Sequence, residues 1–262
     1  MQTRTLPAAA GWGWIGTGFA IFRRNPPMLA LLVVCYWVTV IFLNVLPVIG
    51  ALAASLVIPG LSVGLMQAAR DLYRGQAVGL PTLFGGLRQN TRTLLALGAL
   101  YLACTLAILG LSALVDGGEL FNFMLSSKPA DRESLESADL LLPSLFVMIL
   151  MAPLMMAYWF APVLAAWHDL GVGKSLFFSL VACSINWRAF LTYGAGLMLV
   201  AGLIPGVIFG LLIGILSGAD SGFVASFIIM PFMAVVALIV FSTVYASYYA
   251  SYRDVFGDPD IA

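Results

Sequence analysis

Apolar stretches of about 20 residues alternate with short polar or basic segments along the whole chain. A helix that crosses a bilayer needs roughly 20 consecutive apolar residues, so each stretch predicts a membrane span. Only Pro47 separates the first two stretches, which therefore form a tight helical hairpin. The six predicted spans cover residues 27–46, 48–69, 92–115, 143–167, 188–216 and 223–250.

Three further segments mix aromatic, aliphatic and basic residues but are too short to cross a membrane. They cover residues 11–24, 81–90 and 174–186. Such segments are typical of amphipathic helices that lie in the interface between lipid and water. The predicted fold class is thus all-α: a polytopic membrane bundle of six spans and three interfacial helices, in one integral membrane domain over residues 1–262, with an outer loop at 116–141.

The composition excludes a water-soluble protein. Hydrophobic residues make up 62% of the chain and charged residues only 9%, whereas a soluble domain carries about 25% charged residues. The 12 basic and 12 acidic side chains balance, so nucleic acid is not an expected partner. Three cysteines without a paired spacing indicate neither disulfides nor a zinc site.

Basic residues predict the orientation. Only Lys128 and Arg132 fall in the outer loop. Under the positive-inside rule the other side is cytoplasmic, and it also holds both termini. The ten residues on that side are Arg4, Arg23, Arg24, Arg70, Arg74, Arg88, Arg92, Lys174, Arg188 and Arg253.

Short sequence motifs that recur along the chain indicate a threefold internal repeat over residues 8–74, 79–170 and 172–257. Each interfacial helix ends in an asparagine (Asn25, Asn90 or Asn186), and each second span ends in Arg or His followed by aspartate. We expect the asparagines to cap the following helices. We expect the aspartates to bond an N–H of an interfacial helix or a basic side chain. These aspartates are Asp71, Asp169 and Asp254.

The only histidine, His168, lies beside Asp169. It could shuttle a proton or ligate a metal, but without other ligand residues the helix-end role is favoured. Met148, Met151 and Met155 share a helix face with a spacing that could hold Cu(I); packing is the favoured alternative. No cofactor or metal is expected.

Glycines at intervals of four residues mark the fifth span: Gly206, Gly210 and Gly214. Small residues at this spacing let two helices approach closely, so we expect packing inside the monomer, with a homo-oligomer seam as the alternative. Prolines within spans should locally open the helical hydrogen bonding. They are Pro59, Pro153, Pro162 and Pro205.

Four tyrosines follow a helical spacing near the end of the sixth span. An aromatic belt at the membrane interface explains them, and a pocket for a lipid headgroup or quinone is the alternative. They are therefore candidate lipid or ligand contacts: Tyr245, Tyr248, Tyr249 and Tyr252.

Several motifs resemble an uncharacterised family of six-span inner-membrane proteins in proteobacteria. They are a Gly11-Trp12-x-Trp14 opening, Phe22-Arg23-Arg24-Asn25-Pro26, Pro47-x-Ile49-Gly50, Gly64-Leu65-Met66 and Ala69-Arg70-Asp71. The chain also resembles, more loosely, the membrane domain of some glycerophosphodiester phosphodiesterases. The family resemblance implies location and topology. The soluble barrel of the looser relative is absent, so its chemistry does not carry over.

The interiors of the predicted spans lack ionisable side chains, which ion-coupled transporters and intramembrane enzymes need. The sequence therefore favours a non-enzymatic scaffold or accessory subunit in a bacterial inner membrane, in contact with lipids and with a membrane-protein partner or a second copy. The alternative is a facilitator or translocator of an apolar or lipid-like solute, for which a repeat would frame the pathway.

Overall fold

The computed structural model describes residues 3–46, 49–118, 138–216, 227 and 229–257, and within these ranges the chain is helical and contains no strand. The all-α fold class is confirmed. Six helical stretches are long and apolar enough to cross a membrane, at nearly the predicted positions. They are Pro26–Asn44, Ile49–Tyr73, Thr91–Val115, Leu142–Trp167, Trp187–Gly214 and Met230–Phe256.

The three short amphipathic segments are also helices, each directly preceding a hairpin of two spans. The first hairpin pairs α2 with α3, the second pairs α5 with α8 and its continuation α9, and the third pairs α11 and α12 with α14. The short helices are α1 (Ala10–Phe22), α4 (Leu80–Gly85) with the 3-10 turn η1 (Gly86–Arg88), and α10 (Val172–Ile185). The hairpin helices are α2 (Pro26–Asn44), α3 (Ile49–Tyr73), α5 (Thr91–Asp116), α8 (Ala138–Trp159), α9 (Ala161–Trp167), α11 (Trp187–Leu197), α12 (Ile204–Leu216) and α14 (Met230–Phe256).

Two of the four prolines lie next to an interruption of a span. The helix breaks at Phe160, two residues before Pro162, and the π-helix η2 (Met198–Leu203) precedes Pro205. Proline lacks an N–H and clashes with the preceding turn, which accounts for both irregularities. α3 and α8 run through Pro59 and Pro153 as continuous helices, so these prolines do not end a helix, and each lacks the N–H that a helical hydrogen bond requires.

Each short helix packs on the second helix of the preceding hairpin, in a cyclic order. The helix α1 lies on α14, α4 and η1 lie on α3, and α10 lies on α8 and α9. Small residues permit two of these approaches, because a Cβ at Gly18 would lie 2.8 Å from Ser247 Cβ and one at Gly64 would clash with the Leu83 backbone. The threefold repeat in the sequence stays a prediction.

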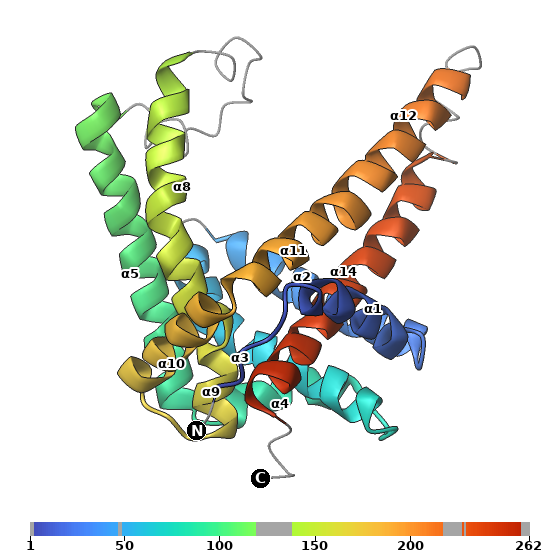
Figure 1. Ribbon diagram of the computed structural model, residues 1–262, viewed down its shortest axis with the longest axis horizontal. Coiled ribbons are helices and arrows are strands. Elements are labelled where there is room, and N and C mark those ends of the chain that lie inside the picture. The colour runs from blue at the N-terminus through green and yellow to red at the C-terminus, as the bar shows by residue number, and fades with distance from the viewer. Residues whose placement is uncertain (1–2, 47–48, 119–137, 217–226, 228, 258–262) are drawn as a thin grey trace.

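The second and third hairpins meet at one end of the structure. We call this end the base: it comprises the three short helices and the last turns of α3, α9 and α14. From it the α5–α8 pair and the α11–α12 and α14 pair diverge (Figure 1). The Arg4 N–H donates to the Val255 carbonyl over 2.9 Å, so the two ends of the described chain also meet at the base.

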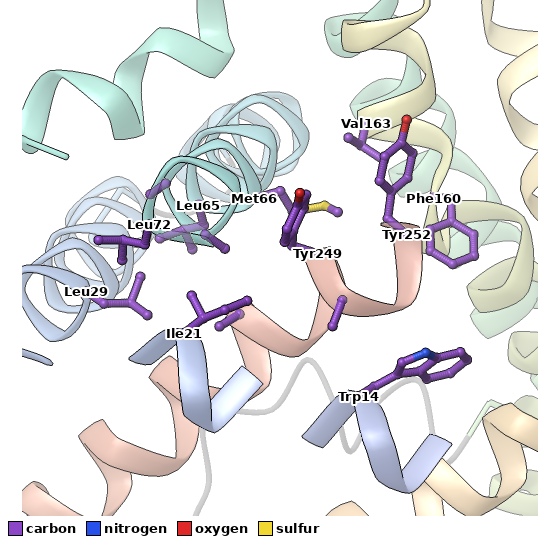
Figure 2. Close-up of a cluster of buried hydrophobic side chains, with 14 of the residues drawn as sticks. Trp14, Ile21, Leu29, Leu65, Met66, Leu72, Phe160, Val163, Tyr249 and Tyr252 are labelled. Carbon is purple, nitrogen blue, oxygen red and sulfur yellow. The ribbon is translucent and has the colours of Figure 1, made fainter. Parts of the chain in front are cut away.

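The hydrophobic core lies in the base. Figure 2 shows Ile21 of α1 beside Leu29, Leu65 and Leu72 of the first hairpin. In contrast, the diverging ends of the hairpins expose large apolar side chains; Leu114 near the end of α5 is 82% exposed. The predicted outer loop, 116–141, mostly falls outside the described residues.

Candidate functional site

Three contacts between side chains link the ends of α3, α9 and α14 into a closed ring. The Arg70 guanidinium lies 4.5 Å from the centre of the Trp167 ring, which joins α3 to α9. His168 Nε2 lies 2.6 Å from the Tyr252 hydroxyl, joining the end of α9 to α14. The cycle closes from α14 to α3, where Arg253 lies over the ring of Tyr73 at 4.7 Å.

The basic member of each contact is the residue that precedes the repeated aspartate. Arg70, His168 and Arg253 thus occupy corresponding positions in the three hairpins. Each reaches an aromatic side chain of the next hairpin in the same cyclic direction. Contacts between a cation and an aromatic ring contribute about 0.5–2 kcal/mol each, more when desolvated. The three contacts therefore stabilise the junction of the hairpins.

Tyr249 of α14 fills the space between these contacts. It is fully buried, and its ring centre lies 5.8 Å from that of Tyr73 and 6.4 Å from that of Trp167. Tyr252, also fully buried, packs against Trp167 at 5.0 Å. Figure 2 shows both tyrosines beside Met66, Phe160 and Val163 of the other two hairpins. Aromatic side chains thus close the base.

This burial corrects the interpretation of the four tyrosines. The predicted interface belt is wrong for Tyr249 and Tyr252, because they pack against other helices of the chain and expose no surface to lipid. Tyr245 is partly buried and stacks on Tyr36 at 5.4 Å. Tyr248 lines a cavity between helices. The tyrosine stripe is mainly a packing face.

The asparagines at the hairpin entrances have three different roles. Asn25 caps α2, because its Oδ1 accepts from the Met28 N–H at 3.3 Å. The predicted caps at Asn90 and Asn186 are wrong: neither side chain bonds a backbone N–H of the helix it precedes. Asn90, in a left-handed conformation with φ of 43°, instead donates to the Ala165 carbonyl at the end of the second hairpin.

Asn186 fixes the start of the chain. Its Oδ1 accepts from the Leu6 N–H at 2.8 Å, and its Nδ2 donates to the Arg4 carbonyl at 3.0 Å. The first hairpin has a comparable tie in Arg24, whose guanidinium donates to the carbonyls of Leu72 and Tyr73. All three hairpin entrances therefore bond a backbone segment of the base.

The three repeated aspartates also differ in their hydrogen-bond partners and in their exposure. Asp254 accepts from the indole N–H of Trp14 in α1 at 3.1 Å and from Arg253, so it bonds both an interfacial helix and a basic side chain. Asp71 accepts from Gln67 at 2.7 Å. Asp169 is exposed and ends its helix in a left-handed conformation, with φ of 50°. Burial lowers the pKa of the neighbouring His168 below its usual range.

The glycine face of the fifth span does not pack inside the described part of the monomer. A Cβ added at Gly206, Gly210 or Gly214 would meet no atom within 4 Å. No described residue packs against Gly206 or Gly210, and packing of this face within the monomer stays a prediction. α12 diverges from the base and its neighbours do not cover this face. The homo-oligomer alternative stays a prediction.

A cavity of about 500 Å³ separates the second and third hairpins. Its walls are apolar and aromatic and come from α8, α10, α11 and α14. A second cavity of about 320 Å³ lies between the first two hairpins, near Tyr101 and Tyr158. Among the described residues no three His, Cys, Asp or Glu side chains are grouped so that they could hold a metal ion. These spaces suit apolar occupants.

Sequence reasoning missed the aromatic partners at the base. Trp14 is fully buried, and Trp159 stacks against Tyr248 with ring centres 4.8 Å apart. The available signal was a tryptophan close to the repeated Asn or Asp in the second and third hairpins. Trp167 precedes His168 directly, and Trp187 follows Asn186.

Comparison with known proteins places the chain in a family. It is 41% identical over 201 residues to a probable inner membrane protein of Burkholderia thailandensis, an alignment that covers 74% of each chain. The chain belongs to the family of this protein. No family model and no solved structure matches it.

Family membership and the six apolar helices together establish an integral membrane protein of a bacterial inner membrane. The membership agrees with the resemblance to uncharacterised inner-membrane proteins. The looser resemblance to the membrane domain of glycerophosphodiester phosphodiesterases stays a prediction, as does the cytoplasmic placement of both termini.

Proposed function

We propose that this inner-membrane protein is a non-enzymatic scaffold or accessory subunit of a membrane complex. The observation that carries the proposal is the contrast between a closed base and uncovered spans. Half of the α3 span is buried inside the chain, but only 6% of the span formed by α11 and α12. A membrane helix that its own chain leaves uncovered offers its surface to lipid or to another membrane helix.

The uncovered surface of α12 fits a helix partner. Val207 and Leu211 are more than half exposed on it, and the space beside Gly206 and Gly210 is open. In lipid, helices associate through close van der Waals packing, and small residues four apart allow the backbones to approach. We infer that α12 packs against a helix of another subunit or of a second copy of this chain.

The closely packed base supports a role in binding other molecules rather than in transporting a solute through the protein. Tyr249 and Tyr252 are fully buried where the three hairpins meet, and Trp14 is fully buried beside them. Two ionisable side chains of this region, Arg70 and Arg253, lie in the last turns of their helices. Coupled transport needs charges at membrane depth. The arrangement supports a protein that acts through its surfaces.

Purification of the tagged full chain from its native membrane in mild detergent tests the proposal. We expect a membrane protein, or a second copy, at a fixed ratio. The double variant Gly206→Leu/Gly210→Leu should release it because it fills the open face. The matched control is Gly110→Leu on α5, where a Cβ also meets open space. A chain that purifies alone as a monomer from a membrane that contains its partners would contradict the proposal.

The cavity between α8 and α11 supports a second candidate function, the facilitation of an apolar or lipid-like solute across or within the membrane. Its apolar walls lie between two diverging hairpins. Liposomes that contain only this protein test it, with a fluorescent phospholipid and a reporter for its exposure on the outer leaflet. Accelerated exchange between leaflets would support this function and count against a purely structural role.

A further inference from the structure

The cavity of about 500 Å³ lies where the cyclic packing of the hairpins has a gap. The first helix of the second hairpin, α5, packs against α3 of the first, and α2 packs against α14. By the same order α11 should pack against α8. Instead, Met155 and Met156 of α8 and Leu191 and Gly194 of α11 line the cavity, and Trp159 contacts Phe190 at its inner end.

The cavity reaches the surface that faces the bilayer. Among its lining residues, Leu191 is 62% exposed, Trp187 is 52% exposed and Met155 is 47% exposed. Its volume lies within the range of about 300–1,000 Å³ that is usual for small-molecule sites. A helix of another protein, about 10–12 Å across with its side chains, does not fit such a space, but a single hydrocarbon chain does.

The indole of Trp159 forms part of the inner wall of the cavity. Trp159 Nε1 is buried and has no hydrogen-bond partner among the described residues. Its ring is held by Tyr248, Phe190 and Tyr193, with centres 4.8, 5.3 and 5.9 Å away. Since Nε1 is buried, the N–H does not face the open space, and the ring gives the cavity an apolar aromatic wall.

A basic side chain stands beside the cavity. Arg188 is exposed in the first turn of α11, next to the lining residue Trp187, and its guanidinium lies 5.4 Å from the centre of the Trp187 ring. No ion pair within the described residues engages it. Arginine binds phosphate well because its planar donors match the phosphate oxygens.

We propose that this cavity binds one anionic glycerophospholipid, with an acyl chain between α8 and α11 and the headgroup phosphate at Arg188. The bound lipid fills the gap between the second and third hairpins. This site goes beyond the scaffold role and does not depend on it, since a scaffold and a facilitator would both carry the lipid.

Native mass spectrometry of the purified full chain tests the proposal, with titration of phosphatidylglycerol and of phosphatidylethanolamine. Gly194→Leu adds a side chain to the cavity where a Cβ meets open space, and we expect binding of phosphatidylglycerol to fall about tenfold. Gly206→Leu, in open space on α12, is the matched control and should bind like the unaltered chain.

The headgroup contact is tested by Arg188→Gln. Its control is Arg92→Gln, which lies two residues after Asn90 just as Arg188 lies two residues after Asn186. We expect Arg188→Gln, and not Arg92→Gln, to remove the preference for phosphatidylglycerol over phosphatidylethanolamine, a loss of about tenfold. A phosphatidylglycerol with a photoreactive group in its acyl chain should label two peptides. One contains residues 155–159 and the other contains residues 190–197.

Three results would overturn the proposal. The first is an equal affinity for phosphatidylglycerol in the unaltered chain, in Gly194→Leu and in Gly206→Leu. Another is photolabelling confined to the outer surfaces of α5 or α12. The third is an unaltered chain that retains no phospholipid and binds none on titration. Circular dichroism and size-exclusion profiles of each variant confirm that it is folded before its binding is compared.

Discussion

His168 Nε2 and the Tyr252 hydroxyl are 2.6 Å apart and join the end of the second hairpin to the last helix of the third. His168 is the counterpart of Arg70 and Arg253 in the other hairpins. Where those arginines lie over aromatic rings, histidine makes a hydrogen bond to a phenol. The chemistry differs between the three contacts, but each joins one hairpin to the next.

Tyr252→Phe should weaken the base while preserving its packing. The substitution removes only the hydroxyl and leaves the ring against Trp167. A lost hydrogen bond costs about 0.5–1.5 kcal/mol, and in a chain of this size 1 kcal/mol lowers Tm by about 2–4 °C. Thermal unfolding in detergent measures the shift. Tyr101→Phe is the control, because Tyr101 lies outside the base and lines the cavity near Tyr158. Equal Tm values for Tyr252→Phe and the unaltered chain would exclude a stabilising role for the bond.

The His168 environment predicts a dependence of stability on pH. Burial lowers the pKa of His168 in the folded protein, so the unfolded chain binds more protons between that pKa and the ordinary value of about 6.5. The free energy of unfolding should therefore be highest above about pH 6.5 and fall as the pH drops below it. Chemical unfolding across this range checks the trend. His168→Gln should reduce the slope between pH 5 and 7, taken as roughly the window of the histidine titration; an unchanged slope would assign the dependence to other groups.

Gly64 and Gly206 should respond oppositely to the same substitution. A Cβ at Gly64 would clash with the Leu83 backbone, whereas one at Gly206 meets open space. We expect Gly64→Val to destabilise the fold by about 1–3 kcal/mol, as overpacking usually does, and Gly206→Val to leave the Tm of the monomer unchanged. Comparable losses in both variants would show that α12 packs inside the monomer after all.

The orientation is open to a fusion experiment. The excess of basic residues at the base predicts that the base is cytoplasmic. A reporter that is active only in the periplasm should be active when fused after Arg132 and inactive when fused after Gly75. Activity after Gly75 and none after Arg132 would reverse the proposed orientation.

The sequence was sufficient to predict the spans, because the length of an apolar stretch is a direct signal of a membrane helix. Asp71, Asp169 and Asp254 marked the ends of the second spans, and these ends lie at the base. It did not predict the partners of Asn90 or Asn186, because Ala165 and Leu6 are distant in sequence. Nor did it separate buried Tyr252 from exposed positions of α14. A helix that is apolar on most faces carries little periodic signal for which face is covered.

The glycines show the same limit. Gly64 and Gly206 both belong to spaced small residues in apolar helices, but only Gly64 meets another helix within the described chain. The spacing indicates that a face can pack closely. Which partner covers it depends on the direction in which the hairpin leaves the base, and the sequence carries no local signal for that direction.

The divergence of the hairpins is the central claim, since the uncovered α12 and the cavity beside α8 both depend on it. Pulsed electron paramagnetic resonance between pairs of nitroxide labels in lipid nanodiscs tests it most directly. Leu114 of α5 and Leu142 of α8 belong to one hairpin, and Leu211 of α12 belongs to another; all three side chains are exposed. We predict a short separation for Leu114 with Leu142 and a clearly longer one for Leu114 with Leu211. Equally short separations would show a closed bundle and contradict the account.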